Sequence, residues 1–135
     1  MELTNFGSIM KFALDRESEV KAILEQASGN KNLSAINGKV AELAALNQGN
    51  VKLLERTRRE NICEMVLHPI TGLNFADYIF STTSAAAISE SEFSSLLADV
   101  SNKLSRFYSE AGEKLPADEA KRVFLKLAKK RYFEA

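Results

Sequence analysis

The chain of 135 residues has one cysteine, Cys63, which excludes an intramolecular disulfide and is typical of a reducing compartment. Its 18 Lys and Arg residues balance its 18 Asp and Glu residues, so no net charge favours nucleic acid or an anionic membrane. No stretch approaches the ~20 apolar residues of a membrane span, and the N-terminal segment becomes charged before a signal-peptide core forms. We therefore expect a cytoplasmic protein with neither nucleic-acid nor membrane partners.

Common catalytic motifs are absent as well. The sequence has no Gly-rich phosphate loop, no zinc-ligand spacing and no nucleotide-binding fingerprint. His68 is the sole histidine and lies five residues from Cys63, but no supporting motif surrounds them, so a capping or loop role is expected. The basic residues within 56–59 are flanked by glutamates, which is typical of a solvated helix face.

Apolar residues recur at spacings of three and four along four segments, the pattern of amphipathic helices. The sequence predicts an all-α fold, one domain over 1–135, with helices at about 5–28, 33–65, 90–112 and 117–133. Ser89 and Glu92 form a capping box for the third helix, and Pro116 suits the first turn of the fourth.

A long connection, about 67–88, separates the first pair of predicted helices from the second. A structureless loop of this length is uncommon in a compact domain, and Leu73–Phe80 is expected to form a short helix within it. Two hairpins joined by one long crossover is the ferritin-like arrangement of a four-helix bundle. The apolar residues of Leu73–Phe80 either cover the edge of the bundle or meet a partner chain in a homodimer.

The two predicted hairpins repeat one another at an offset of 84 residues, without a gap between their helices. Apolar residues coincide at most of the core positions, which indicates two copies of one helical hairpin. The matched pairs are Ile9 with Phe93, Ala13 with Leu97, Val20 with Leu104, Leu24 with Tyr108, Ala27 with Ala111, Ile36 with Ala120, Val40 with Phe124 and Leu43 with Leu127.

Each apolar stripe is interrupted by polar residues in symmetric places. The repeat pairs Glu17 with Ser101, Asn47 with Arg131, and Asn50 with Glu134. Because a charge on a buried face requires a partner, the set predicts one polar centre inside the bundle. Taken singly, each residue also fits a surface or interhelical edge.

The apolar pattern resembles the rubrerythrin-type ferritin-like family over all four helices, most closely in FYSEAGEKLPADEAKRVFLKLAKKRYFEA. The resemblance implies a Glu on the first helix of each pair and Glu-x-x-His on the second, which together hold two iron ions. At those positions the chain keeps Glu17 and has Ser101, Asn47-x-x-Asn50 and Arg131-x-x-Glu134. The family's rubredoxin-like centre is excluded because it requires paired Cys-x-x-Cys motifs.

These substitutions predict that the di-iron centre is lost. Both imidazoles are missing, and the permanently charged Arg131 would occupy the place of a metal cation. An ion pair of Arg131 with Glu17, with hydrogen bonds from Asn47 and Asn50, is the expected replacement. We expect no catalytic residue, no bound metal and no cofactor, with Glu17, Asn47, Asn50, Ser101, Arg131 and Glu134 as vestigial positions.

Three functions fit this sequence. The first is a non-catalytic binding or structural module, in the form of a homodimer. The second is an oxidoreductase-related protein of the di-iron carboxylate type, with iron or manganese in an atypical site that uses Glu17 and Glu134. The third is a small-ligand site in the vacated core, with a pocket lined by Asn47, Asn50 and Ser101 as its signature.

Overall fold

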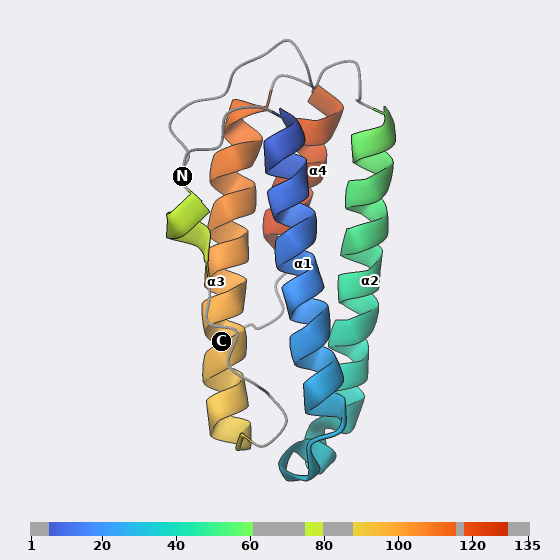
Figure 1. The fold of residues 1–135 in the computed structure, drawn as a ribbon, viewed down its shortest axis with the longest axis vertical. Helices are drawn as coiled ribbons and strands as arrows, with labels where there is room; N and C mark the ends of the chain where they lie inside the picture. The colour runs from blue at the N-terminus through green and yellow to red at the C-terminus, as the bar shows by residue number, and fades with distance from the viewer. Residues whose placement is uncertain (1–5, 61–74, 80–87, 116–117, 130–135) are drawn as a thin grey trace.

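The computed structural model describes residues 6–60, 75–79, 88–115 and 118–129, and all regular secondary structure in them is helical (Figure 1). Helix α1 packs against α2, and α3 against α4; α2 also contacts α4, and α1 contacts α3. The predicted all-α class, with four helices in two hairpins, is confirmed. The elements are α1 (Phe6–Ser28), η1 (Lys31–Ile36), α2 (Asn37–Glu60), η3 (Phe75–Tyr78), α3 (Glu90–Lys114) and α4 (Asp118–Lys129).

The directions of the helices require a long connection between the hairpins. In Figure 1, α1 descends, α2 and α3 both ascend, and α4 descends. Helix α2 therefore ends at the opposite end of the bundle from the start of α3. Of the predicted crossover at 67–88, only 75–79 and 88 belong to the described residues, so Cys63 and His68 lie outside them.

The second helix begins later than the sequence predicts. Residues 33–36, expected as its first turn, belong to the 3₁₀ helix η1. The reason is local hydrogen bonding, because the Asn30 side chain accepts from the N–H of Asn32, and the Asn37 N–H donates to the carbonyl of Ser34 three residues earlier. The α-helical ladder consequently starts at Asn37, and the predicted end at 61–65 lies outside the described residues.

Capping defines the ends of α3. The Ser89 hydroxyl accepts from the N–H of Glu92 at 3.2 Å, and the Glu92 carboxylate accepts from the N–H of Ser89 at 3.2 Å, which confirms the capping box. At the other end, the Leu115 N–H bonds the carbonyl of Gly112, so α3 extends two residues past that glycine. The predicted fourth helix, 117–133, is described only as α4, and its last residues lie outside the described part.

The core lies along the apolar stripes of all four helices. Both members of nearly every matched repeat pair are buried, the partly exposed Ile36 being the exception. Glu17 and its repeat counterpart Ser101 are also both buried. The repeat read from the sequence therefore corresponds to equivalent positions in the two hairpins.

The crossover segment packs onto the bundle through Tyr78. Its side chain is 3% exposed, and its ring lies edge-on to Phe107 at 5.3 Å and to Phe12 at 6.4 Å between centroids. Such edge-to-face pairs stabilise beyond their buried area. Tyr78 thus covers the edge of its own bundle, whereas the adjacent Ile79 is 52% exposed.

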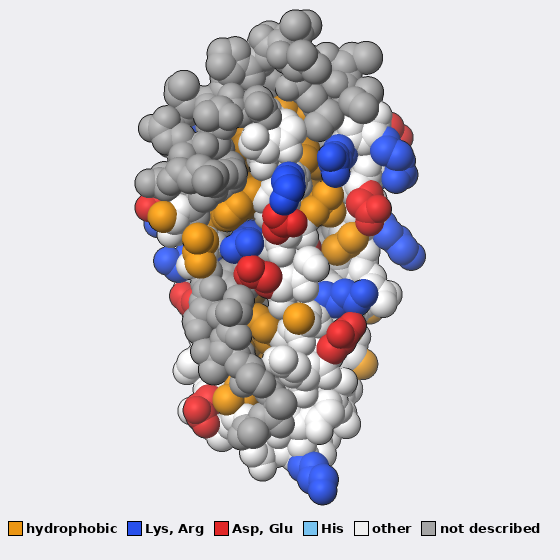
Figure 2. Space-filling model, in the orientation of Figure 1, with side chains coloured by type: hydrophobic (Ala, Val, Ile, Leu, Met, Phe, Trp, Pro, Cys, Tyr) orange, Lys and Arg blue, Asp and Glu red, His pale blue; other side chains and the backbone are white. Residues whose placement is uncertain are grey.

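The outer surface carries charges of both signs. Figure 2 shows Lys and Arg interspersed with Asp and Glu among the described residues of this face. Many form pairs one helical turn apart, such as Lys11 with Asp15 and Arg56 with Glu60. Such exposed pairs contribute about 0–1 kcal/mol each. None of the described helices combines the length and apolar character needed to cross a membrane.

Candidate polar centre and adjoining groove

The four predicted polar positions that the structure describes are all buried. Glu17 is 0% exposed, Asn47 and Asn50 are each 1% exposed, and Ser101 is 2% exposed. They come from α1, α2 and α3. The two remaining positions, Arg131 and Glu134, lie outside the described residues, and so does the expected Arg131 to Glu17 ion pair.

Both asparagines of α2 bond to Glu17 of α1. The Asn50 amide nitrogen Nδ2 donates to Oε1 of the Glu17 carboxylate at 3.1 Å. The Asn47 Nδ2 donates to the main-chain carbonyl of Glu17 at 2.9 Å. The expected hydrogen bonds from these asparagines to Glu17 are therefore present, one to its side chain and one to its backbone.

Helix geometry brings these groups together. Asn47 and Asn50 are three residues apart, so they lie on one face of α2. Glu17 lies four residues after Ala13 and three before Val20, which places it on the apolar stripe of α1. Because α1 and α2 pack as an antiparallel hairpin, the two stripes meet inside the bundle.

The bonds satisfy groups that are expensive to bury alone. A carboxyl group removed from water requires a hydrogen-bond partner. A protein hydrogen bond contributes about 0.5–1.5 kcal/mol net, and a buried polar group left unsatisfied costs about 1–3 kcal/mol. The Asn50 to Glu17 bond thus fixes the register of α2 on α1, and the Asn47 bond adds a second tie one turn away.

The described side chains do not suit a di-iron centre. Within residues 6–60, 75–79, 88–115 and 118–129, no three His, Cys, Asp or Glu side chains lie close enough together to hold a metal ion. The described contacts of the Glu17 carboxyl group and main chain come from the amides of Asn50 and Asn47. Iron sites of the carboxylate type require several anionic oxygens with imidazole, and amides do not supply that charge.

Three further polar side chains bond main-chain carbonyls, two of them between segments and one within α2, and the sequence analysis did not identify them. The Asn30 Nδ2 donates to the carbonyl of Ile88 at 2.9 Å, which ties the first hairpin to the start of α3. The Ser105 hydroxyl donates to the carbonyl of Ala128 at 2.8 Å, across α3 and α4. The Thr57 hydroxyl bonds the carbonyl of Leu53 one turn earlier. Only Asn30 lies where the sequence offers a signal, since it follows Gly29 between the first two predicted helices.

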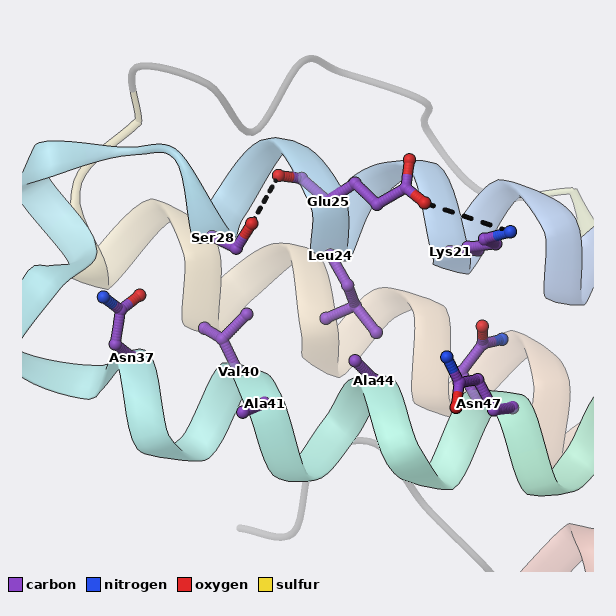
Figure 3. A pocket seen from close by; sticks show the side chains of 10 residues that line it. Lys21, Leu24, Glu25, Ser28, Asn37, Val40, Ala41, Ala44 and Asn47 are labelled. Atoms are coloured by element: carbon purple, nitrogen blue, oxygen red, sulfur yellow. Dashed lines mark hydrogen bonds and ion pairs between the residues drawn. The ribbon is translucent and has the colours of Figure 1, made fainter.

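A groove of about 430 Å³ lies beside the centre, between α1 and α2 (Figure 3). Leu24 of α1 points toward Val40 and Ala44 of α2, so the floor is apolar. Asn47 lines one end, whereas Asn50 and Ser101 do not line the groove. The predicted pocket in the bundle core, lined by all three, thus differs from the groove observed, which opens to one side of the hairpin.

Tyr78 anchors a second polar cluster, on the α3 side. Its hydroxyl donates to Oε1 of Glu110 at 2.9 Å, and Arg106 also donates to that oxygen, at 3.0 Å. The Arg106 guanidinium lies 5.7 Å from the centroid of the Tyr78 ring. Burial, the hydrogen bond to Glu110 and the charge of Glu110 together raise the pKa of Tyr78 well above its ordinary value, although Arg106 partly opposes this.

The centre is therefore a set of interhelical hydrogen bonds, and the groove beside it is an open apolar hollow. Among the described residues, neither has the arrangement of nucleophile, base and orienting group that a hydrolytic site requires. Comparison with models of known protein families, with curated protein sequences and with solved structures finds no match for this chain.

Proposed function

We propose that this chain is a ferritin-like protein related to rubrerythrin that has lost its di-iron centre and acts as a non-catalytic binding or structural module. The observation that carries the proposal is the bond from Asn50 to the buried carboxylate of Glu17. A side chain at a ligand position of the family is engaged in holding two helices together. The parallel α2 and α3, and the repeat of the two hairpins, support the ferritin-like topology.

Metal analysis tests this proposal directly. Protein purified without chelators and dialysed should retain iron and manganese far below one ion per chain. Its melting temperature should not change when iron(II) or manganese(II) is added, because a ligand that binds only the folded state would raise it. Stoichiometric metal that is lost in the Glu17→Gln variant would instead support the alternative, a metal-binding protein that uses Glu17 and Glu134.

We also propose that the chain forms a homodimer through its crossover segment, Leu73–Phe80. The support is Ile79, the one large apolar side chain among the described residues that is mostly exposed, at 52%. It lies next to Tyr78, which is held on the bundle, so its position is fixed. Sedimentation analysis should find a dimer that Ile79→Glu converts to a monomer, whereas Ala45→Glu on α2 leaves it intact. A monomeric parent chain would exclude this interface.

A further inference from the structure

The two hairpins carry side chains of different size at equivalent positions of the 84-residue repeat. In the second hairpin, Leu125 of α4 lies against Gly112 of α3: a Cβ built on this glycine would be 3.2 Å from the Leu125 Cδ2. The equivalent residues of the first hairpin, 84 positions earlier, are Ala41 and Ser28. An aliphatic side chain therefore packs against the facing helix in one copy, and a methyl group stands at the equivalent position in the other.

Further along the second hairpin, a side-chain hydrogen bond joins its two helices. The Ser105 hydroxyl donates to the carbonyl of Ala128 at 2.8 Å and so joins α3 to α4 directly. The equivalent positions in the first hairpin are Lys21 and Ala44, both of which line the open groove. The groove therefore lies where the first hairpin has Ala41 and Lys21 at the positions that Leu125 and Ser105 hold in the second.

The dimensions of the groove suit a small, slender molecule. Its volume of about 430 Å³ falls within the range of roughly 300–1,000 Å³ typical of ligand pockets. Along α2 its lining runs from Asn37 to Gln48, which is about 16 Å at the helical rise of about 1.5 Å per residue. The floor of Leu24, Val40 and Ala44 supplies an apolar surface along this length.

The polar groups around the floor carry no net charge. Lys21 and Glu25 are paired with each other at 4.0 Å, with side chains 62% and 69% exposed (Figure 3). The other polar lining residues are the uncharged Ser28, Asn37, Asn47 and Gln48. The rim therefore offers a charged ligand no net attraction, whereas its amides and hydroxyls suit a hydrogen-bonding group.

We propose that the α1–α2 groove binds a small, uncharged aliphatic molecule with one hydrogen-bonding end group, of the class of alcohols and primary amides. The aliphatic part takes the place that Leu125 occupies in the second hairpin. The end group lies at the polar rim. This inference rests on the proposed function as a binding module and names the ligand class of that module.

The test uses 1-octanol and octanamide as probes and octanoate as the charged comparator, with the full chain. Titration followed by methyl NMR should shift the signals of Leu24, Val40 and Ala44 in a saturable manner. Octanoate should bind more weakly, by about tenfold or more, since its charge is unmatched. Absence of saturable shifts at these methyl groups, or octanoate binding as tight as that of octanol, would overturn the proposal.

Ala41→Leu is the decisive variant, because it places in the first hairpin the side chain that fills the second. It should weaken octanol binding by about tenfold or more through steric exclusion. Ala45→Leu is the matched control, since Ala45 is exposed on the same helix and does not line the groove, and it should leave affinity unchanged. If Ala41→Leu does not fold, Ser28→Leu replaces it as the test variant, because it places a leucine side chain in the groove from α1.

The outcomes separate this inference from the proposed function. Affinity unchanged in both groove-filling variants would reject the ligand site but leave the metal analysis, and hence the loss of the di-iron centre, untouched. A variant that instead converts a dimer to a monomer would show that a second copy of the chain occupies the groove, which also overturns the ligand proposal. Metal retention by the parent chain would reject the proposed function, whether or not octanol binds in the groove.

Discussion

The amide of Asn50 donates to the carboxylate of Glu17 at 3.1 Å, and both side chains are almost fully buried. Their helices are antiparallel partners, so this bond works as an interhelical tie inside a largely apolar core. In water the same bond would contribute little, because each group would exchange one hydrogen bond for another. In the core, removal of either partner leaves the other buried without its bond.

The first prediction concerns Glu17→Ala, which we expect to lower the free energy of unfolding by roughly 2–4 kcal/mol. The change leaves a cavity and removes the acceptor of the Asn50 amide. Glu17→Gln keeps the side-chain volume and an acceptor oxygen, so its free energy of unfolding should fall by less than that of Glu17→Ala. Urea unfolding followed by far-ultraviolet circular dichroism measures the free energy of unfolding of the parent chain and of both variants.

Glu25→Ala is the control for this series. Glu25 lies on the same helix with its side chain 69% exposed, and its pair with Lys21 spans 4.0 Å. Its removal should change stability by no more than about 0.5 kcal/mol, as for most surface substitutions. Equal urea-unfolding midpoints for Glu17→Ala and Glu25→Ala would show that the polar centre adds nothing to stability.

The second prediction contrasts two glycines. A Cβ at Gly112 would be 3.1 Å from the Phe124 Cβ, an atom next to the backbone that moves only with its helix, so Gly112→Ala should be destabilising by about 1–2 kcal/mol. At Gly49, inside α2, nothing lies within 4 Å of the added atom. Gly49→Ala should therefore be stabilising by about 0.5–1 kcal/mol through helix propensity.

Thermal unfolding of the two alanine variants shows whether each substitution stabilises or destabilises the fold. The close approach of α3 and α4 at Gly112 predicts melting temperatures that move in opposite directions from the parent value. If Gly112→Ala raises the melting temperature as much as Gly49→Ala does, the helices are not held together at this glycine. The comparison also tests the filled state of the second hairpin, on which the contrast with the open groove depends.

The third prediction concerns Tyr78→Phe and alkaline pH. At neutral pH the variant loses the bond to Glu110 and should be less stable by about 1 kcal/mol. The pKa of Tyr78 is higher in the folded chain than its unfolded value of about 10, so the folded state holds this proton more tightly. The stabilisation of the folded state that comes from this proton is fully present below about pH 10. It is lost as the pH rises from there toward the pKa of Tyr78 in the folded chain.

The stability advantage of the parent chain over Tyr78→Phe should therefore shrink above about pH 10. Subtracting the variant removes the effects of the other titrating groups, because both chains share them. Denaturant titrations at neutral pH and at several alkaline values supply the difference. A constant difference across this range would mean that the Tyr78 hydroxyl is not held by burial and by Glu110.

Much of the fold was predictable because it depends on local patterns. Spacings of three and four define the helices, and the capping box at Ser89 fixes the start of α3. The burial of Glu17 and of its asparagine partners followed from their positions on apolar stripes. The 3₁₀ turn at Lys31–Ile36 did not follow, because it depends on a side-chain bond from Asn30 that competes with the helix.

Details that depend on tertiary packing were not predictable. The spacing of Asn47 and Asn50 puts them on one face, but only the side-chain geometry shows that one bonds a carboxylate and the other a backbone carbonyl. The contact of Tyr78 with Glu110 joins residues 32 apart in a segment with no periodicity. The open groove likewise depends on how closely each pair of helices approaches, which Ala41 and Leu125 alone do not set.

The last prediction concerns a variant that introduces part of the ligand set of the family that the sequence resembles. Asn47→Glu with Asn50→His creates Glu-x-x-His on the face of α2 that meets Glu17. With three ligands available, the variant should bind zinc or manganese(II), and metal at 100 times its dissociation constant should stabilise it by about 2.7 kcal/mol. Elemental analysis after dialysis and thermal unfolding with and without metal measure this, with the parent chain as the control.

Adding Arg131→Glu to this double variant tests the sequence-based placement of that guanidinium in the centre. If Arg131 lies there, its permanent charge opposes a metal ion, and its replacement by a carboxylate should tighten binding by about tenfold or more. Lys129→Glu, an exposed position on α4, makes the same change of charge outside the centre and should have little effect. Equal affinities for the two triple variants would place Arg131 away from the metal and leave Glu17 without the cationic partner that the sequence predicts. A folded double variant that takes up no metal would show that the side chains at positions 17, 47 and 50 do not converge on one point.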